Sequence, residues 1–353
     1  DIRDWEERIN RIIGAETQRE YVFELKIDGL SIAIDYKDGK LIKAATRGDG
    51  KMGEDVTANV RTIKTLPQTI KHKGALSIRG EVFINKADFR QINDQQAKAG
   101  KAIYANPRNT AAGSLRQLDP KITATRNLDA IFYSLFTENA LGSNKAGQLL
   151  LLDSPNRNDI AFKTHYESLL KLEQMGFKTN SKFNKLCNNI EEVIDLYKEW
   201  EEKKDQLDFQ IDGAVIKINQ LNLQNTLGST AKTPRWAIAL KFTAEVAETQ
   251  IESVSYEVGR LGTITPVANL SPVQLAGTTV KRATLHNFDQ VDRLGVRIGD
   301  WVQVRKAGEI IPEIISVNLD KRPAHSQIIK VPDACPICRS EIERDDVSYR
   351  CIN

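Results

Sequence analysis

Six residues near the N-terminus, Glu24-Leu25-Lys26-Ile27-Asp28-Gly29, place an amine between two carboxylates at alternate positions. On a β-strand, residues i, i+2 and i+4 point to the same face, so Glu24, Lys26 and Asp28 would lie side by side. This arrangement fits a lysine nucleophile that is held by its neighbours. It also fits an exposed strand face with solvated ion pairs, which is the commoner fate of such residues. On these six residues alone, the solvated face is the favoured interpretation.

The composition of the 353-residue chain is that of an ordinary globular protein of two or three domains, with a formal net charge of +3. The hydrophobic fraction of 41% and the charged fraction of 27% exclude disordered, collagen-like and mucin-like classes. The longest apolar runs, at 149–152 and 236–240, are far shorter than the ~20 residues of a membrane helix. Three of the four cysteines lie after residue 334, which indicates a reducing compartment rather than a disulfide framework.

Hydrophobic periodicity predicts an α+β region followed by a β-rich region. Residues 1–14 predict a helix with Trp5, Ile9 and Ile12 on one stripe and Gly14 at its end. Alternation predicts further strands, with a hairpin turn at Asp38-Gly39. We expect strands at 21–26, 30–36, 40–46, 77–84, 130–136, 213–219 and 236–242, helices at 86–99, 109–118, 165–175 and 189–203, and a surface insertion at 138–160. After residue 244, short runs broken by Gly and Pro predict a small barrel.

The chain resembles a known family in the order of many motifs. Lys26-Ile27-Asp28-Gly29 matches the KxDG motif of covalent nucleotidyltransferases, which include DNA ligases, RNA ligases and mRNA capping enzymes. Bacterial NAD-dependent DNA ligases share with it, in order, ATRGDGKMGEDVTANVRTI (45–63), RGEVF (79–83), ANPRNTAAGSLRQLDP (105–120), FQIDGAVIKIN (209–219), TPRWAIALKF (233–242), VGRLGTITPVANL (258–270), ATLHN (283–287) and RLGVRIGDWVQVRKAGEIIPEI (293–314). The resemblance runs from about residue 20 to the end and leaves only 138–160 unmatched. It reverses the preference at Lys26 in favour of a nucleophile.

The resemblance implies three phosphoryl transfers. A lysine amine attacks the α-phosphate of NAD and expels nicotinamide mononucleotide, AMP then moves from the lysine to the 5′-phosphate of a nick, and the 3′-hydroxyl finally displaces AMP. Lys26 is the nucleophile by its place in the motif. A free lysine amine is mostly protonated at neutral pH, so nearby cations and a Mg²⁺ (or Mn²⁺) ion would have to favour its neutral form.

The same resemblance implies a set of binding residues. Glu81 resembles a ribose-contacting or metal-contacting glutamate, although it could instead be the cross-strand partner of Arg79. Tyr133 stands where the family places an aromatic ring on adenine, although a core tyrosine is nearly as plausible. Lys217 and Lys241 correspond to later motif lysines, and Asp212 could help to hold the magnesium ion. The implied contacts to NAD are Glu24, Asp28, Gly29, Arg47, Glu81, Tyr133, Lys217 and Lys241.

The expected partner is nicked double-stranded DNA, and the expected protein is a monomer without membrane contact. Basic residues gather at 98–126 and 260–306, which indicates two phosphate-binding surfaces. The expected DNA contacts are Arg108, Arg116, Arg260, Lys281 and Arg305. His286 could be a polar core residue or a DNA contact. Lys204 stands where some relatives carry arginine, so a phosphate contact there would be less fixed in geometry.

Cys335, Cys338 and Cys351 have the spacing of a zinc ribbon, which takes four ligands. The fourth cysteine that the family would supply lies beyond Asn353, so we expect zinc in a longer parent protein and leave it doubtful in this chain. The absence of an initial Met also suggests part of a longer chain. The module of the family that grips the nicotinamide half of NAD would precede this sequence, so we expect poor self-adenylation from NAD by the 353 residues alone.

These inferences give one expected architecture. An α+β nucleotidyltransferase domain of antiparallel sheets with helices, ATP-grasp-like, is followed by an all-β OB-fold barrel and an incomplete zinc ribbon. The expected boundaries are 1–19 for an N-terminal helix and linker, 20–243, 244–325 and 326–353. The expected location is the bacterial cytoplasm, at the nucleoid. Two alternatives remain: an ATP-dependent ligase or capping-type enzyme, which the motifs at 45–57 and 106–119 disfavour, and a catalytically silent DNA-binding scaffold, which would have no reason to keep Lys26, Glu81, Lys217 and Lys241.

Overall fold

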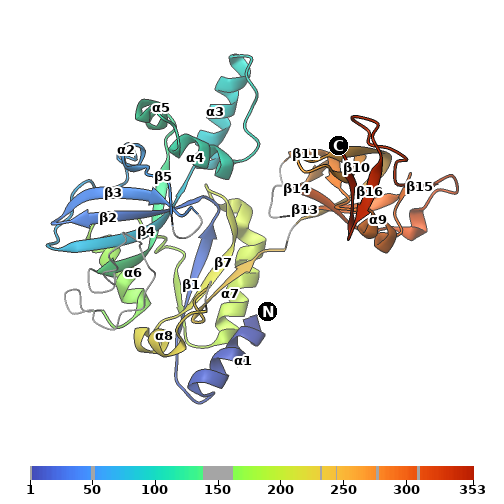
Figure 1. Cartoon of the computed structure of the whole chain (residues 1–353). Coiled ribbons are helices and arrows are strands. Elements are labelled where there is room, and N and C mark those ends of the chain that lie inside the picture. Colours follow the sequence, from blue (N-terminus) through green and yellow to red (C-terminus); the bar gives the residue numbers. More distant parts are fainter. Residues whose placement is uncertain are drawn as a thin grey trace. The chain divides into compact units, whose positions relative to one another are not determined.

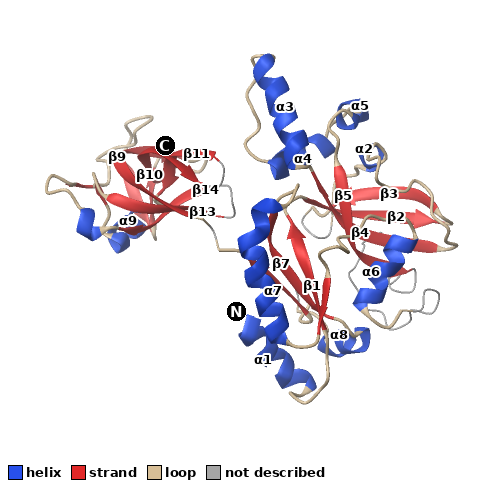
Figure 2. Ribbon diagram, turned by 180° about the vertical axis from the view of Figure 1, so that it is seen from behind, coloured by secondary structure: helices blue, strands red, loops and turns tan. Residues whose placement is uncertain are grey.

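The computed structural model describes residues 2–48, 52–137, 162–230, 233–243, 245–275, 278–307 and 311–353. The predicted insertion at 138–160 lies outside the described residues. The chain divides into two compact units, Asp1–Phe242 and Thr243–Asn353, whose elements are labelled in Figure 1 and coloured by type in Figure 2.

Two four-stranded antiparallel sheets form the first unit. One has the order β6-β1-β7-β8 and the other the order β3-β2-β4-β5. Their strands are β1 (Tyr21–Ile27), β2 (Leu30–Lys37), β3 (Lys40–Thr46), β4 (Ala75–Phe83), β5 (Asp129–Thr137), β6 (Lys185–Cys187), β7 (Ile211–Ile218) and β8 (Ala237–Lys241). Because only Asp28 and Gly29 separate β1 from β2, the chain passes from one sheet to the other beside the KxDG motif.

Local sequence determines several turns and helix ends, of which the turn at Asp38-Gly39 was predicted. The β2–β3 hairpin turns at Asp38 and Gly39, whose φ angles are 49° and 77°, as two-residue hairpins require. Pro107 occupies the first turn of α4 (Pro107–Leu115), where its missing N–H costs nothing, and Asn106 caps that helix. The predicted helix at 109–118 is therefore shifted, and Asp119 caps a separate helix α5 (Pro120–Ala124).

Helices cover the outer faces of the sheets and enclose two hydrophobic cores. The helix α7 (Ile190–Lys203) packs on β1 and β7, and α1 (Ile2–Ile13) lies beside α7 and α8 (Leu221–Leu227) (Figure 2). The helices α4 and α6 (His165–Gln174) pack on the other sheet. The remaining helices are α2 (Thr57–Val60), α3 (Lys86–Lys98) and a 3₁₀ turn at Lys204–Gln206.

The buried stripe of α1 differs from the predicted one. Ile2, Trp5 and Ile9 are buried, whereas Ile12 is 47% exposed. Trp5 also donates an indole N–H hydrogen bond to the carbonyl of Arg235, at 2.9 Å. The periodicity allows both 2-5-9 and 5-9-12 as stripes, and this docking contact selects the first.

The second unit contains a closed barrel of five strands. Its strand order is β11-β14-β13-β9-β10, and pairing of β10 with β11 closes the ring. The short helix α9 (Phe288–Leu294) lies between the third and fourth barrel strands, as expected of an OB-fold. The barrel strands are β9 (Val246–Val258), β10 (Thr263–Leu275), β11 (Thr278–Thr284), β13 (Trp301–Ala307) and β14 (Ile311–Val317), and a small separate pair consists of β12 (Arg297–Ile298) and β15 (Gln327–Ile328).

The C-terminal cysteine segment is joined to this barrel. The hairpin of β16 (Ile342–Asp345) and β17 (Ser348–Cys351) extends the sheet through pairing of β17 with β10. Tyr349 on β17 packs edge-on against Phe288, with ring centroids 5.3 Å apart. Among the described residues, no helix is long and apolar enough to cross a membrane.

Candidate active site

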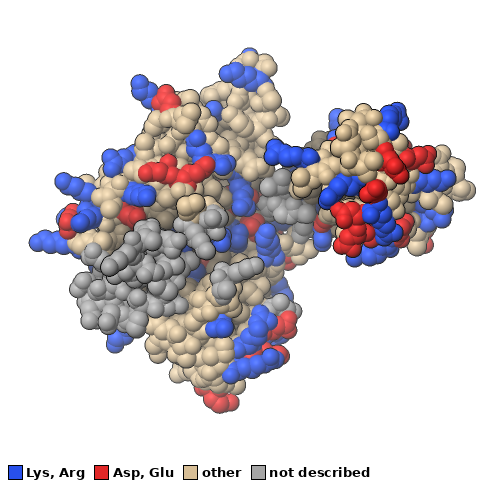
Figure 3. Space-filling view, viewed as in Figure 1, with Lys and Arg blue, Asp and Glu red and all other residues tan. Residues whose placement is uncertain are grey.

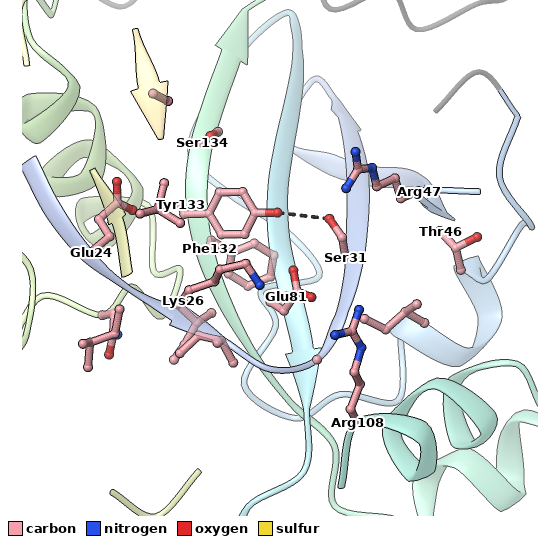
Figure 4. A pocket seen from close by; sticks show the side chains of 18 of the residues that line it. Glu24, Lys26, Ser31, Thr46, Arg47, Glu81, Arg108, Phe132, Tyr133 and Ser134 are labelled. Atoms are coloured by element: carbon pink, nitrogen blue, oxygen red, sulfur yellow. Dashed lines mark hydrogen bonds between the residues drawn. The ribbon is translucent and has the colours of Figure 1, made fainter. Parts of the chain in front are cut away.

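A cavity of about 1150 Å³ lies between the two sheets of the first unit. Its walls come from β1, β2, β4, β5 and β7 and from the loop after β3, so both sheets contribute side chains. In Figure 4, Lys26 lies between Glu24 on one side and Arg108 on the other. The cavity is lined by the predicted nucleophile Lys26. Of the residues predicted to contact NAD, it is also lined by Glu24, Gly29, Arg47, Glu81, Tyr133 and Lys217.

The Lys26 amine forms an ion pair with Asp212. Its Nζ atom lies 2.7 Å from both carboxylate oxygens of Asp212, which is a buried residue at the start of β7. Lys241 is less involved, because its Nζ is 4.0 Å from Asp212, its side chain is 63% exposed, and it is not part of the cavity wall. The Lys26 amine is thus held at one point inside the cavity.

Glu24 forms a buried cluster with two cationic or polar partners. Its Oε1 atom lies 2.7 Å from Lys217 Nζ and 2.8 Å from His165 Nε2. Burial alone would raise the pKa of Glu24, but the positive charge of Lys217 and the hydrogen bonds from Lys217 and His165 outweigh it and lower the pKa to about 2. Sequence reasoning missed His165, and no local motif marks it, because it starts a helix 141 residues after Glu24.

The strand pattern predicts that Asp28 faces the cavity together with Glu24 and Lys26. In the structure Asp28 does not line the cavity. Asp28 follows Ile27, the last residue of β1, and belongs to the two-residue connection to β2, where strand alternation no longer applies. The buried Asp28 carboxylate instead accepts a hydrogen bond from Arg108 Nη1 at 2.9 Å. Gly29 is required next to it, because a Cβ atom there would come within 2.3 Å of the Val82 carbonyl oxygen.

Glu81 is a desolvated carboxylate in the cavity wall. Burial raises its pKa to about 7, and Lys26 and Arg108 oppose that shift. Among the described residues its carboxylate makes no hydrogen bond or ion pair. The alternative role of Glu81 as a cross-strand partner of Arg79 does not apply, because both residues lie on β4. Glu81 is therefore an oxygen donor available to a ribose hydroxyl or to a hard cation such as Mg²⁺.

Tyr133 presents its ring to the cavity and anchors its hydroxyl. The hydroxyl lies 3.0 Å from Ser31 Oγ (Figure 4). Lys217 Nζ lies 5.4 Å from the ring centroid. Burial raises the pKa of Tyr133 to about 12, so its hydroxyl is neutral. The flat ring and the Glu24–Lys217 pair thus form one end of the cavity.

Three arginines, Arg47, Arg108 and Arg116, also line the cavity. Arg108 and Arg116 were expected as DNA contacts, so the structure brings them to the same site as the residues expected to contact NAD. Two asparagines that sequence reasoning missed, Asn180 and Asn184, line it too. Each buries one side-chain polar atom without a hydrogen-bond partner among the described residues.

The other expected DNA contacts lie in the second unit and are exposed. These are Arg260, Lys281 and Arg305. Positive and negative side chains are interspersed on the face of this unit in Figure 3. Arg305 pairs with Glu313 at 2.6 Å, and His286 contacts the same carboxylate at 2.8 Å with its ring 49% exposed. His286 is therefore a surface residue rather than a core residue.

The three C-terminal cysteines come together in space. The sulfur atoms of Cys335, Cys338 and Cys351 all lie within 4.8 Å of one another. Thiolates at such separations suit the tetrahedral coordination of zinc and provide three of its four usual ligands.

Models of protein families match both units. The model of the NAD-dependent DNA ligase adenylation domain matches residues 1–245, and that of the NAD-dependent DNA ligase OB-fold domain matches residues 248–326. The chain belongs to the NAD-dependent DNA ligase family. Its first unit is the adenylation domain of that family and its second unit contains the OB-fold.

Curated ligases of this family are similar over the whole chain. The DNA ligase of Bacillus cereus strain B4264 is 44% identical over 355 residues, which cover 100% of this chain and 50% of the relative. The DNA ligase of Bacillus thuringiensis strain Al Hakam gives the same identity and coverage. The chain thus spans about half the length of the curated relatives that it matches. A solved structure titled as a Chlorella virus DNA ligase-adenylate has 14% identity and a TM-score of 0.31, covering 86% of this chain and 94% of that chain.

Proposed function

We propose that this chain forms a lysine–AMP intermediate from NAD and uses it to seal nicks in double-stranded DNA. The position of the Lys26 amine carries the proposal, because it stands in the cavity between a flat aromatic end and an arginine-lined end. The base of AMP would lie on Tyr133 beside Glu24 and Lys217. The α-phosphate would then lie near Lys26, within reach of Arg47 and Arg108.

The Lys26 amine must lose a proton before it can attack phosphorus. Asp212 is the nearest base, since both of its carboxylate oxygens lie 2.7 Å from Nζ. The arginines hold the phosphate oxygens and stabilise the charge that builds up during transfer. Attack by Nζ forms the N–P bond, and the bond to the nicotinamide mononucleotide oxygen breaks. These are the roles that the chain's own residues take in the first step.

The carboxylates of Asp212 and Glu81 are the groups that would hold a Mg²⁺ ion. Both are oxygen donors close to Lys26, which is the ligand type that hard cations prefer. When bound, such an ion supplies positive charge that stabilises the transferring phosphoryl group. Cys335, Cys338 and Cys351 would contribute three ligands to a zinc ion that supports the end of the second unit.

DNA would be held mainly through its phosphates, because a ligase must act at any sequence. Arg260, Lys281 and Arg305 are exposed cationic groups on the OB-fold unit that fit this role. In the later steps AMP passes from Lys26 to the 5′-phosphate of the nick. The 3′-hydroxyl then attacks that phosphate and releases AMP.

The proposal is tested by offering the purified chain different AMP donors with Mg²⁺ and reading its intact mass. The donors are NAD, ATP and nicked DNA that already carries 5′-AMP. We expect a slow and incomplete mass gain of one adenylyl group from NAD, no gain from ATP, and sealing of the pre-adenylated nick. Gain from ATP alone would favour the ATP-dependent alternative. No gain from any donor, together with no sealing, would favour the silent scaffold.

A further inference from the structure

His165 lies directly behind two residues of the cavity wall. Its side chain is 8% exposed and it does not line the cavity itself. Its Nε2 atom lies 2.8 Å from Glu24 Oε1 and 3.1 Å from Lys217 Nζ, while those two atoms are 2.7 Å apart. The three polar atoms therefore form a closed triangle in a buried place.

The backbone around His165 is tied to the strand that carries Lys217. The N–H of His165 donates to the Asn219 carbonyl at 2.7 Å, and the N–H of Tyr166 donates to the Asn219 side chain at 3.0 Å. Thr164 and Glu167 form a capping box that fixes the first turn of α6. Because Asn219 follows Lys217 by two residues, the imidazole is held against the ammonium group by two independent anchors.

The protons of this triangle limit what each group can do. Nε2 of a neutral imidazole carries either a proton or a lone pair, so it either donates to Glu24 or accepts from Lys217. When Nε2 donates to Glu24, it cannot accept from Lys217. The Lys217 ammonium then has three N–H groups but only two close acceptors, Glu24 and, at 3.4 Å, the Tyr133 carbonyl. Its third N–H group is available to a ligand in the cavity. Glu24 Oε2 has no hydrogen-bond partner among the described residues. Glu24 Oε2 is then an acceptor, and the Lys217 ammonium a donor, for one ligand in the cavity.

We propose that His165 is a positioning residue that holds Glu24 and Lys217 as this acceptor–donor pair, and thereby sets a preference for a 6-aminopurine over a 6-oxopurine. The inference rests on the proposed function, because it places the base of AMP at the Tyr133 end. Adenine presents a donor at N6 and an acceptor at N1, which complement the pair. Hypoxanthine presents an acceptor and a donor in those positions, so both contacts become repulsive. A site built around such hydrogen bonds discriminates strongly, provided that its groups cannot turn.

The test compares binding of AMP and of inosine monophosphate to the full 353-residue chain by titration calorimetry. His165→Phe fills the same space without a polar atom, and His165→Gln keeps a neutral hydrogen-bonding group. We expect the wild type to prefer AMP. In His165→Phe the AMP affinity should fall about tenfold and the preference should largely vanish, since one hydrogen bond to a buried charged pair is lost. His165→Gln should keep most of the preference, and Tyr166→Phe, on the same helical turn, should keep all of it.

A further variant, His165→Ala, controls for a loss of binding that is caused by misfolding. His165→Ala should lose the preference and regain part of it when free imidazole is added, which a purely structural role of the side chain would not produce. An unchanged AMP preference in a folded His165→Phe overturns the inference and leaves the proposed function intact. Equal affinity of the wild type for AMP and inosine monophosphate would also overturn the inference and leave the proposed function intact. A wild-type chain that binds neither nucleotide overturns the proposed function as well.

Discussion

Glu81 couples the cavity to pH near neutrality. Its pKa is raised to about 7 because burial disfavours the charged carboxylate, even though Lys26 and Arg108 oppose that effect. At neutral pH both forms are therefore populated. A bound cation would favour the ionised form, whereas an empty cavity favours the neutral one. Glu81 is thus the side chain in this cavity whose charge responds most directly to a bound metal ion.

The raised pKa of Glu81 predicts a loss of stability as pH rises. Between about pH 4.5 and 7 the folded chain holds a proton here that the unfolded chain has released, so the free energy of unfolding falls with pH across this window. In Glu81→Gln the side chain stays neutral. The stability of the wild type relative to Glu81→Gln should therefore drop by roughly 2–3 kcal/mol between pH 5 and pH 8.

Urea denaturation of both proteins at the two pH values measures this difference. Other groups that titrate in the same range cancel in the comparison. A constant difference at both pH values would mean that Glu81 is ionised throughout, contrary to the burial argument.

The sequence did not predict which distant residues pair with the charged residues of the cavity. The KxDG motif, together with the other motifs of the family, identified Lys26 and its neighbours, yet each charged residue of this segment pairs with a residue far along the chain. Glu24 pairs with Lys217 and Asp28 with Arg108. Strand alternation gives the direction of a side chain but neither the neighbouring strand nor a bulge. The pairing of β1 with β7 brings Glu24 close to Lys217, and helix α4 brings Arg108 to Asp28.

At the scale of elements, Trp5 is the largest of the buried side chains that fix α1 to the adenylation unit. Trp5 is 4% exposed, packs on Tyr21 and donates a hydrogen bond to the Arg235 carbonyl. Trp5→Ala should lower the free energy of unfolding by roughly 3–5 kcal/mol, because it leaves a cavity and an unpaired carbonyl. Ile12→Ala, on the exposed side of the same helix, should change it by less than about 0.5 kcal/mol.

Thermal or urea unfolding of the two variants compares the faces directly. Similar losses for both would show that α1 docks through the 5-9-12 stripe that the sequence equally allowed.

The strands β2 and β3 were predicted well from short patterns. Alternation and the Asp38-Gly39 turn located both strands to within a residue. Helix α4 was misplaced by two or three residues because the signals at Asn106 and Pro107 outweigh apolar periodicity at its ends.

At the scale of the whole molecule, binding of nicked DNA should depend steeply on salt and little on sequence. Each phosphate neutralised by the chain releases a counterion from the DNA. Lys281 is an exposed cation in a strand of the barrel, so Lys281→Ala should lower the slope of log affinity against log salt by about 0.9. Fluorescence anisotropy with a labelled nicked duplex at several salt concentrations gives both slopes.

Arg282→Ala is a matched control for this measurement. Arg282 is adjacent in sequence but is paired with Glu257 at 2.6 Å, so its charge is already partly compensated. Its removal should reduce the slope less than that of Lys281. An affinity that is independent of salt, or one that favours a particular flanking sequence, would argue against phosphate binding by this unit.

The central claim is that Lys26 carries AMP, and locating the adenylyl group on the chain tests it most directly. The chain is incubated with Mg²⁺ and either NAD or pre-adenylated nicked DNA, digested, and mapped by tandem mass spectrometry. Lys26→Ala is treated in parallel, and its affinity for nicked DNA should match the wild type because the amine is not a main DNA contact. The account predicts one AMP group on Lys26 of the wild type and none on Lys26→Ala. AMP on any other residue, or labelling of Lys26→Ala, would contradict it.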